Sequence, residues 1–239
     1  MVTQPRTTEL LWGSSARPKR GPKPALSLEQ IVATAIAMAD ADGLATLSMQ
    51  RLAEDLGFTK MSLYRYTPGK TELIALMLDA ALGPAPDLSD LDKDWRAALH
   101  EWALRMSAGL RRHPWVVDVA VGPRVLGPNE LGWLETGLAA LSGTGLTGGE
   151  RLDSIVLITG HVRSLAQQMT APGAVTDTPE KSLNDIMSGI LTAHADRYPE
   201  AAAAFASASS TSGQDDALEF GLARIFDGLT ALVAARNAS

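Results

Sequence analysis

The stretch from Thr46 to Lys70 constrains the fold of this chain more than any other part of the sequence. Ser48 is a good N-cap for a helix whose apolar residues recur at positions i, i+3, i+4 and i+7. Gly57 follows the last of these residues, where a left-handed residue would end that helix. Thr59 can then cap a second helix, in which Leu63 points inward. The sequence therefore predicts two short helices joined by a tight turn.

Three residues of this stretch have the spacing of a helix-turn-helix. Ala53 is small enough for the second helix to cross close to the first, Gly57 makes the turn, and Leu63 would pin the crossing. The second helix then presents a polar face with an aromatic ring and two cations, which suits a DNA major groove. The residues of this face are Lys60, Met61, Ser62, Tyr64 and Arg65. An ordinary helical hairpin with a solvated surface fits the same spacing, so spacing alone leaves both interpretations open.

A compact helical unit surrounds this motif and covers residues 27–82. Ser27 and Gln30 form a capping box at the start of a first helix, which ends at Gly43. After Gly69 a connecting helix begins, and it ends at Gly83. The sequence therefore predicts a three-helix domain followed by a connecting helix.

The N-terminal residues 1–26 are predicted to form a disordered basic arm. Residues 1–24 carry five basic residues and one acidic residue, and the segment from Arg17 to Pro24 is too rich in proline to be a helix. Such an arm could follow the minor groove or the phosphates beside a DNA-binding unit, or serve only as a charged tail that aids solubility. Both interpretations remain open.

The rest of the chain also has helical periodicity, and no long segment alternates as a strand does. The fold class is therefore predicted to be all-α, with a helical domain over residues 87–239. Helices are expected at residues 94–113, 115–121, 129–141, 150–169, 180–196 and 215–236. Residues 200–214 are rich in alanine and then serine, and we expect them to be of low complexity and mobile.

Composition excludes several classes of protein. The chain has no cysteine, which excludes disulfides and thiolate chemistry, and no apolar run long enough to cross a membrane. Its N-terminus lacks a secretory signal, so we expect a cytoplasmic protein. Residues 1–76 hold nine Lys and Arg against seven Asp and Glu, a balance of +2, whereas residues 77–239 hold twelve against twenty, a balance of −8. An acidic second part would help to direct the first part at a phosphate backbone.

The chain resembles the tetracycline-repressor (TetR) family of transcriptional regulators. The matching residues are Gly43-Leu44, Ser48, Gly57, Leu63-Tyr64-Arg65-Tyr66, and Lys70 with Glu72-Leu73. The remainder is similar to the C-terminal ligand-binding and dimerisation domain of the tetracycline-repressor subgroup, more loosely, in helix order and in the segments HPWV and LEFGLARIFDGL.

This resemblance implies that the second helix of the motif lies in the major groove and that two subunits read a palindrome. The residues implied to read bases are Gln50, Lys60, Met61 and Ser62. The residues implied to hold phosphates are Thr46, Ser48, Tyr64, Tyr66 and Lys70. Arg65 could do either, and Thr59, which caps the reading helix, belongs to the same surface. Where the family often has histidine, this chain has Tyr66, which could still donate to a phosphate.

The second domain offers candidates for an effector pocket and for a dimer interface. An apolar effector could lie among bulky side chains with a histidine as its polar contact, although each of these residues could equally be core. The candidates are Trp102, Met106, His113, Trp115, Trp133 and His161. The broad apolar faces of residues 150–169 and 215–236 predict a four-helix interface between two subunits, with burial inside one subunit as the alternative. The candidates are Ile155, Thr159, Val162, Leu218, Leu222, Phe226 and Leu229, with Gly221 and Gly228 allowing close approach.

We therefore expect a homodimeric DNA-binding regulator, a repressor that a small-molecule effector releases from a palindromic operator, with the connecting helix as the lever. A regulator without a small ligand, controlled by a protein partner or constitutive, is one alternative. A helical enzyme is the other, although no catalytic group stands out. Gly143, Gly145 and Gly148 match a dinucleotide-binding pattern, but a helix precedes them where a strand is required. The four histidines are too scattered for a metal site, so we expect no metal and no cofactor.

Overall fold

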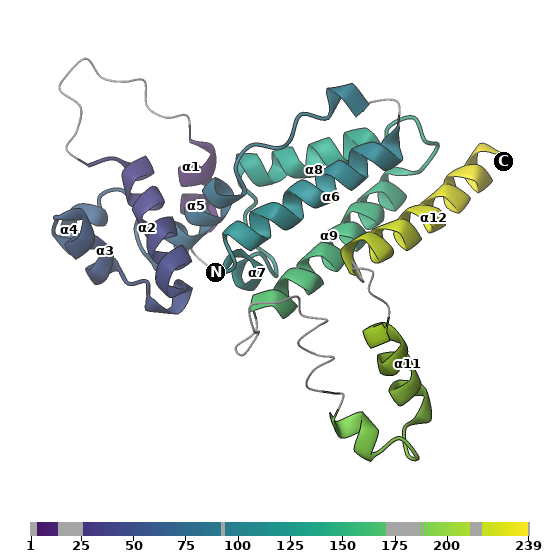
Figure 1. The fold of residues 1–239 in the computed structure, drawn as a ribbon. Helices are drawn as coiled ribbons and strands as arrows, with labels where there is room; N and C mark the ends of the chain where they lie inside the picture. The colour runs from purple at the N-terminus through teal and green to yellow at the C-terminus, as the bar shows by residue number, and fades with distance from the viewer. Residues whose placement is uncertain are drawn as a thin grey trace. The chain divides into compact units, whose positions relative to one another are not determined.

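A computed structural model describes residues 4–13, 26–91, 94–170, 187, 189–210 and 217–238. Every regular element in these residues is a helix, which confirms the all-α prediction (Figure 1). The elements are α1 (Gln4–Trp12), α2 (Leu28–Asp42), the 3₁₀ turn η1 (Leu44–Thr46), α3 (Met49–Leu56), α4 (Lys60–Leu63), α5 (Lys70–Leu82), the 3₁₀ turn η2 (Ser89–Leu91), α6 (Trp95–Arg112), α7 (Val116–Val119), α8 (Pro128–Ala140), α9 (Gly148–Thr170), α11 (Pro199–Ser210) and α12 (Ala217–Asn237).

The chain forms two compact units, the first ending at Ile155 and the second beginning at Val156. Within the first unit we call α2 to α5 the head, and α6, α7 and α8 the platform. The predicted boundary between residues 82 and 87 lies inside this unit, so it does not separate two independently packed bodies. The division into a DNA-binding domain over 27–82 and an effector-binding domain over 87–239 concerns function, and it stays a prediction.

The first helix of the head begins where the sequence predicts. The Ser27 hydroxyl accepts the backbone N–H of Gln30 at 3.2 Å, and the Gln30 side chain accepts the backbone N–H of Ser27 at 2.9 Å. This is a complete capping box, which satisfies two donors that a helix start otherwise leaves free. Ile31 and Ala35 on the inner face of α2 are fully buried, and Gly43 ends the helix with φ of 80°.

The helix-turn-helix is also confirmed. The Ser48 hydroxyl accepts the backbone N–H of Arg51 at 3.1 Å, and Gly57 takes up the left-handed conformation with φ of 74°. Ala53 and Leu63 are 1% and 0% exposed, as the close crossing of α3 and α4 requires. Helix α4 is a single turn, and the chain continues through turns to residue 66.

The connecting helix α5 is the helix of the head that packs against the platform. It contacts α1 and α2 on one side, and it also contacts α6, α7 and α8 (Figure 1). Leu73 and Met77 in its interior are fully buried. Dense cores are little compressible, so this packing is compatible with the lever role expected for α5, which stays a prediction.

Helix α1 corrects the prediction of a disordered arm over residues 1–26. Residues Gln4–Trp12 form a helix that contacts α5, and its Thr7 and Leu11 side chains are buried. The Trp12 indole N–H donates to the carbonyl of Leu126 at 2.9 Å. Tertiary burial of a few apolar residues stabilises a short helix whose sequence alone predicts little. The proline-rich segment from Arg17 to Pro24 lies outside the described residues.

Helix α11 is the second correction, because residues 200–214 were expected to be mobile. Residues Pro199–Ser210 are helical, since alanine is the best helix former and Pro199 suits the first helical position. Residues 211–214 lie outside the described residues, as do residues 180–186 and 188 of the helix expected at 180–196. Of that expected helix, residues 187 and 189–193 are helical.

In the second unit, the part of α9 beyond Ile155 packs against α12. A Cβ atom built on Gly221 of α12 would lie 2.2 Å from His161 of α9, so only glycine allows the imidazole to approach this closely. The His161 ring nitrogen Nε2 lies 3.3 Å from the carbonyl oxygen of Leu218. Among the described residues, every helix is too short or too polar to span a lipid bilayer.

Candidate nucleic-acid interface

The residues predicted to read bases remain accessible on α3 and α4. Met61 is 73% exposed, the highest value for any large apolar side chain in the described part of the chain. Lys60 is exposed next to it, with its ammonium nitrogen 5.8 Å from the centre of the Tyr64 ring. Gln50 donates from Nε2 to Glu54 Oε1 at 2.6 Å, so it must exchange this partner to pair with adenine. Ser62 is half-buried.

Several predicted phosphate holders keep a free donor. The hydroxyl of Ser48 accepts its capping bond, which leaves its proton for another acceptor. The Lys70 ammonium donates one proton to the carbonyl of Leu47 at 2.6 Å, and an ammonium has three. Tyr64 and Arg65 are exposed, whereas Thr59 shares its hydroxyl with Ser62 at 2.9 Å and caps α4. These residues therefore keep groups that a DNA backbone could contact, and their role as phosphate holders stays a prediction.

Thr46 and Tyr66 differ from the prediction that they donate to phosphates. The Thr46 hydroxyl donates to the carbonyl of Gly43 at 2.9 Å. The Tyr66 hydroxyl donates to the carbonyl of Leu26 at 2.8 Å. Because a hydroxyl carries one proton, each of these donors is used inside the protein. In this structure Thr46 stabilises the turn after α2, and Tyr66 stabilises the start of α2.

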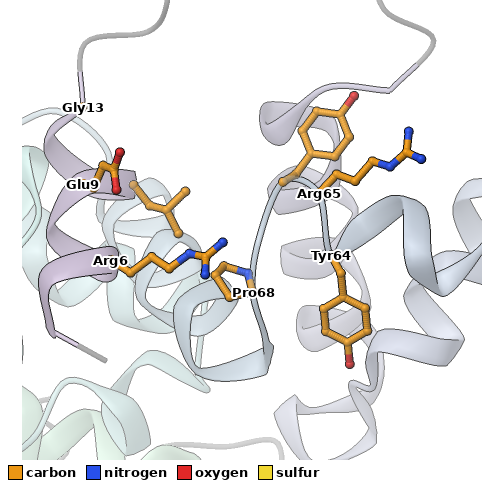
Figure 2. A pocket seen from close by; sticks show the side chains of 8 residues that line it. Arg6, Glu9, Gly13, Tyr64, Arg65 and Pro68 are labelled. Atoms are coloured by element: carbon orange, nitrogen blue, oxygen red, sulfur yellow. The ribbon is translucent and has the colours of Figure 1, made fainter. Parts of the chain in front are cut away.

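A cavity of about 390 Å³ lies between α1 and the turn that follows α4. Figure 2 shows Arg6 and Glu9 of α1 on one side of it, Tyr64 and Arg65 on the other, and Pro68 between them. The sequence missed the participation of α1 in this surface, because residues 1–26 were assigned to an arm. The cavity mixes one carboxylate with two cations, so it is more polar than a site for an apolar effector would be.

The end of α2 is bonded to the platform through Asp40. The Trp115 indole N–H donates to Asp40 Oδ1 at 2.7 Å. The His113 ring nitrogen Nδ1 lies 2.9 Å from Oδ1 and 3.0 Å from Oδ2 of the same carboxylate. His113 and Trp115 were predicted to line an effector pocket, but their polar atoms face the head. Nothing in the sequence marked Asp40, because its partners lie more than 70 residues further along the chain.

The end of α5 is bonded to the start of α8. Asp79 Oδ1 accepts the backbone N–H of Glu130 at 3.0 Å and thereby caps α8 from another helix, while the side-chain amide of Asn129 donates to the Asp79 carbonyl at 3.0 Å. The Trp133 indole N–H donates to the carbonyl of Gly83 at 3.1 Å. Burial raises the pKa of the Asp79 carboxyl above its ordinary value, and the hydrogen bonds from Glu130 and Asn129 lower it by less. The nearby Glu130, which pairs with Arg124, raises this pKa further.

The remaining candidates for an effector pocket lie in packed surroundings. The rings of Trp102 and Trp133 meet edge to face with centroids 5.8 Å apart, and the Trp102 indole N–H donates to the carbonyl of Trp133 at 3.0 Å. Both are buried, and Met106 is half-buried. His161 packs against Gly221 in the second unit. The side chains therefore have partners within the protein, and their contact with an effector stays a prediction.

The residues chosen for a dimer interface are mostly interior. Five of the seven are buried within the single chain, so they do not offer a surface to a second copy, and the alternative of internal packing holds for them. They are Ile155, Val162, Leu222, Phe226 and Leu229. Thr159 and Leu218 are half-buried. The exposed apolar residues of α9 and α12 in the second unit lie at other positions, with Val156 69%, Leu157 53% and Phe220 65% exposed. The sequence missed these because both faces of the helices carry apolar residues.

Two family models match the chain. Residues 31–77 match the description "Bacterial regulatory proteins, tetR family", and residues 86–233 match "Tetracyclin repressor-like, C-terminal domain". The first match covers most of the head, and the second covers the platform and most of the second unit.

Known proteins agree with these models. The chain is 41% identical to the HTH-type transcriptional repressor DrrR1 of Streptomyces coeruleorubidus, over 97% of this chain and 87% of that protein. It is similar to the crystal structure of apo ActR from Streptomyces coelicolor, with a TM-score of 0.74, 25% identity, and coverage of 89% of this chain and 98% of that one. It is also similar to ActR in complex with actinorhodin, with a TM-score of 0.71, 27% identity, and coverage of 87% and 98%.

Proposed function

We propose that this chain, which belongs to the tetR family of bacterial regulatory proteins, acts as a homodimer that represses transcription from a palindromic operator until a small molecule releases it. It is a DNA-binding transcriptional repressor with a helix-turn-helix head. The two-fold symmetry, the palindrome and the contact residues belong to the proposal.

One observation carries the assignment of the reading surface. Met61 is 73% exposed on α4, next to the exposed Lys60, while Leu63 on the other side of the same turn is fully buried. A thioether that water surrounds in the free protein can pack on a thymine methyl group, and the neighbouring ammonium can reach guanine O6 and N7. Ser48, Lys70, Tyr64 and Arg65 would then hold phosphates on either side and fix the register.

The exposed apolar residues of the second unit support a dimer. Val156, Leu157 and Phe220 lie on α9 and α12, whose opposite faces are already buried. Each helix thus has an inner apolar face and a second, solvent-exposed set of apolar residues. Self-association of this surface would place two heads on one duplex, as a palindromic operator requires.

A small aromatic compound would best suit an effector site beside Trp102 and Trp133. The relative ActR is described in complexes with actinorhodin and with (S)-DNPA. In this chain, Trp102 and Trp133 supply aromatic surfaces, with Met106 nearby on α6. Because the Trp133 indole also bonds to Gly83 at the end of α5, insertion of a ligand beside these rings would pull on the connecting helix.

Selection from random duplexes tests the proposal. The full chain should enrich an inverted repeat, and footprinting should show protection of both half-sites. Tryptophan fluorescence should then be quenched by an aromatic compound that also lowers operator affinity. Recovery of a sequence without two-fold symmetry would contradict the dimeric palindrome, and absence of any selected sequence would contradict sequence-specific binding.

A further inference from the structure

Two separate attachments hold the head to the platform. The first is at the end of α5, where Asp79 and Gly83 bond to α8. The second is at the end of α2, where Asp40 bonds to the segment between α6 and α7. With the first attachment alone, the head would be held to the platform only through α5, and α2 would have more freedom to shift. The second attachment, on a different helix, restricts that shift.

The Asp40 attachment is well built for this purpose. One carboxylate accepts from two rigid ring donors, so its position is fixed by two hydrogen bonds with different directions. Trp115 is 4% exposed, and the side chains of His113 and Asp40 are 14% and 29% exposed. Because water has limited access, these charge-assisted bonds are stronger than they would be on an open surface.

A change in the orientation of α2 would move the reading helix α4 with it. Helix α2 packs against both α3 and α5, and α3 packs against α4. Ile31 and Leu52 in these helices are fully buried, so the head moves as one body. A change at Asp40 therefore changes where α4 points without altering any residue of α4.

We propose that Asp40 is a positioning residue that sets the spacing of the half-sites this repressor can read. The proposal rests on the dimeric function proposed above. In a dimer, the angle of each head determines the distance between the two reading helices, which must match successive major grooves about 34–36 Å apart. Asp40 fixes the angle of the head through its hydrogen bonds to His113 and Trp115, and α4 makes the base contacts.

The experiment compares full-length wild type with Asp40→Ala and with Asp118→Ala as the matched control. Asp118 is an exposed aspartate of α7, so its replacement removes the same atoms and the same charge. Operators with the selected half-sites and with spacers shortened or lengthened by one and two base pairs are titrated at fixed salt. Wild type and Asp118→Ala should prefer the native spacer by about tenfold or more over its neighbours, because one base pair shifts and rotates a half-site.

The Asp40→Ala protein should bind the native spacer more weakly and show a preference reduced to about threefold or less, since a head held only through α5 tolerates more spacings. Trp115→Phe, which keeps an aromatic side chain and removes the indole N–H, should give an intermediate preference. It provides a second test if Asp40→Ala folds poorly. Spacer preference equal to wild type in the folded variants would overturn the proposal. Absence of any palindrome bound by wild type would instead overturn the proposed function.

Discussion

Gly221 of α12 lies directly against the imidazole of His161 of α9, at a distance that leaves no room for a side-chain carbon. The contact lets the two helices of the second unit approach closely and brings His161 Nε2 to the carbonyl of Leu218. Gly228, two turns further along α12, has no atom within the same reach. These two glycines of one helix therefore play different roles.

Replacing them with alanine should change stability in opposite directions. Gly221→Ala should lower the free energy of unfolding by about 1–3 kcal/mol, because the imidazole must move and lose its partner. Gly228→Ala should raise it by about 0.5–1 kcal/mol, since alanine is the better residue inside a helix. Urea denaturation followed by circular dichroism measures both. Equal stabilisation by the two substitutions would contradict the close packing of His161.

Asp79 should make stability depend on pH. Because its pKa is raised in the folded protein, the folded state binds more protons than the unfolded state from pH 3.8 up to that raised pKa. The free energy of unfolding should therefore fall as the pH rises through this interval.

Asp79→Asn keeps an oxygen to cap α8 and should flatten this dependence, with stability at neutral pH at least that of wild type. Asp79→Ala should lose about 1 kcal/mol, since it removes the cap. Thermal melts across a pH series measure this dependence. If the stability of Asp79→Asn changed with pH as steeply as that of wild type, Asp79 would not be its source.

Lys60→Ala should relax the protein's specificity at one base pair of the operator and weaken binding by about 1–3 kcal/mol. The loss should be concentrated on the selected sequence, because Lys60 is assigned a base contact. Titration of the protein against every single-base variant of the selected half-site measures this. Glu54→Ala on α3 provides a contrast, since it frees Gln50 for a base contact and leaves the cation in place. A uniform loss across all sequences would identify Lys60 as a phosphate contact instead.

Tyr66→Phe should affect folding more than DNA binding. Its hydroxyl donates to Leu26, so its removal should cost about 0.5–1.5 kcal/mol of stability. The slope of log Kobs against log salt should stay at the wild-type value. Arg65→Ala should instead reduce the magnitude of that slope by about 0.9, as loss of one phosphate contact requires. A reduced slope for Tyr66→Phe would restore the phosphate role predicted from the sequence.

If the proposed dimer forms through this surface, Val156→Glu should convert it into a monomer without unfolding it, since this side chain is 69% exposed. A charge in the middle of a self-associating apolar surface is desolvated without a partner. Leu131→Glu, on an exposed site of α8, should leave the dimer intact. Analytical ultracentrifugation distinguishes the two states. Persistence of the Val156→Glu dimer would place the interface elsewhere.

Local signals in the sequence located the helices of the head. Ser27, Ser48 and Gly57 act within a turn of themselves, so their roles follow from neighbouring residues. The bonds of Asp40 could not be predicted, because they join residues 73 and 75 positions apart through the fold. A contact of that kind depends on how whole helices pack.

The faces of the second unit show a different limit. Helix α12 is apolar on more than one side, so periodicity located the helix and one apolar face but not whether that face is internal or lies between subunits. Leu222 and Phe226 proved to be inside and Phe220 outside. The sequence did not predict helix α1 for a related reason, since its stability comes from burial against α5 more than from its own sequence.

The bonds from α8 to Asp79 and Gly83 limit how this regulator can be recombined with others. A chimaera joined just after Gly83 would carry the capping carboxylate on one parent and the capped helix on the other. Grafting a foreign platform onto this head would leave Asp79 without its α8 partner unless that parent supplies a matching helix start. A fragment that keeps this contact must therefore carry Asp79 together with the start of α8, and a fragment that ends at Gly83 loses it.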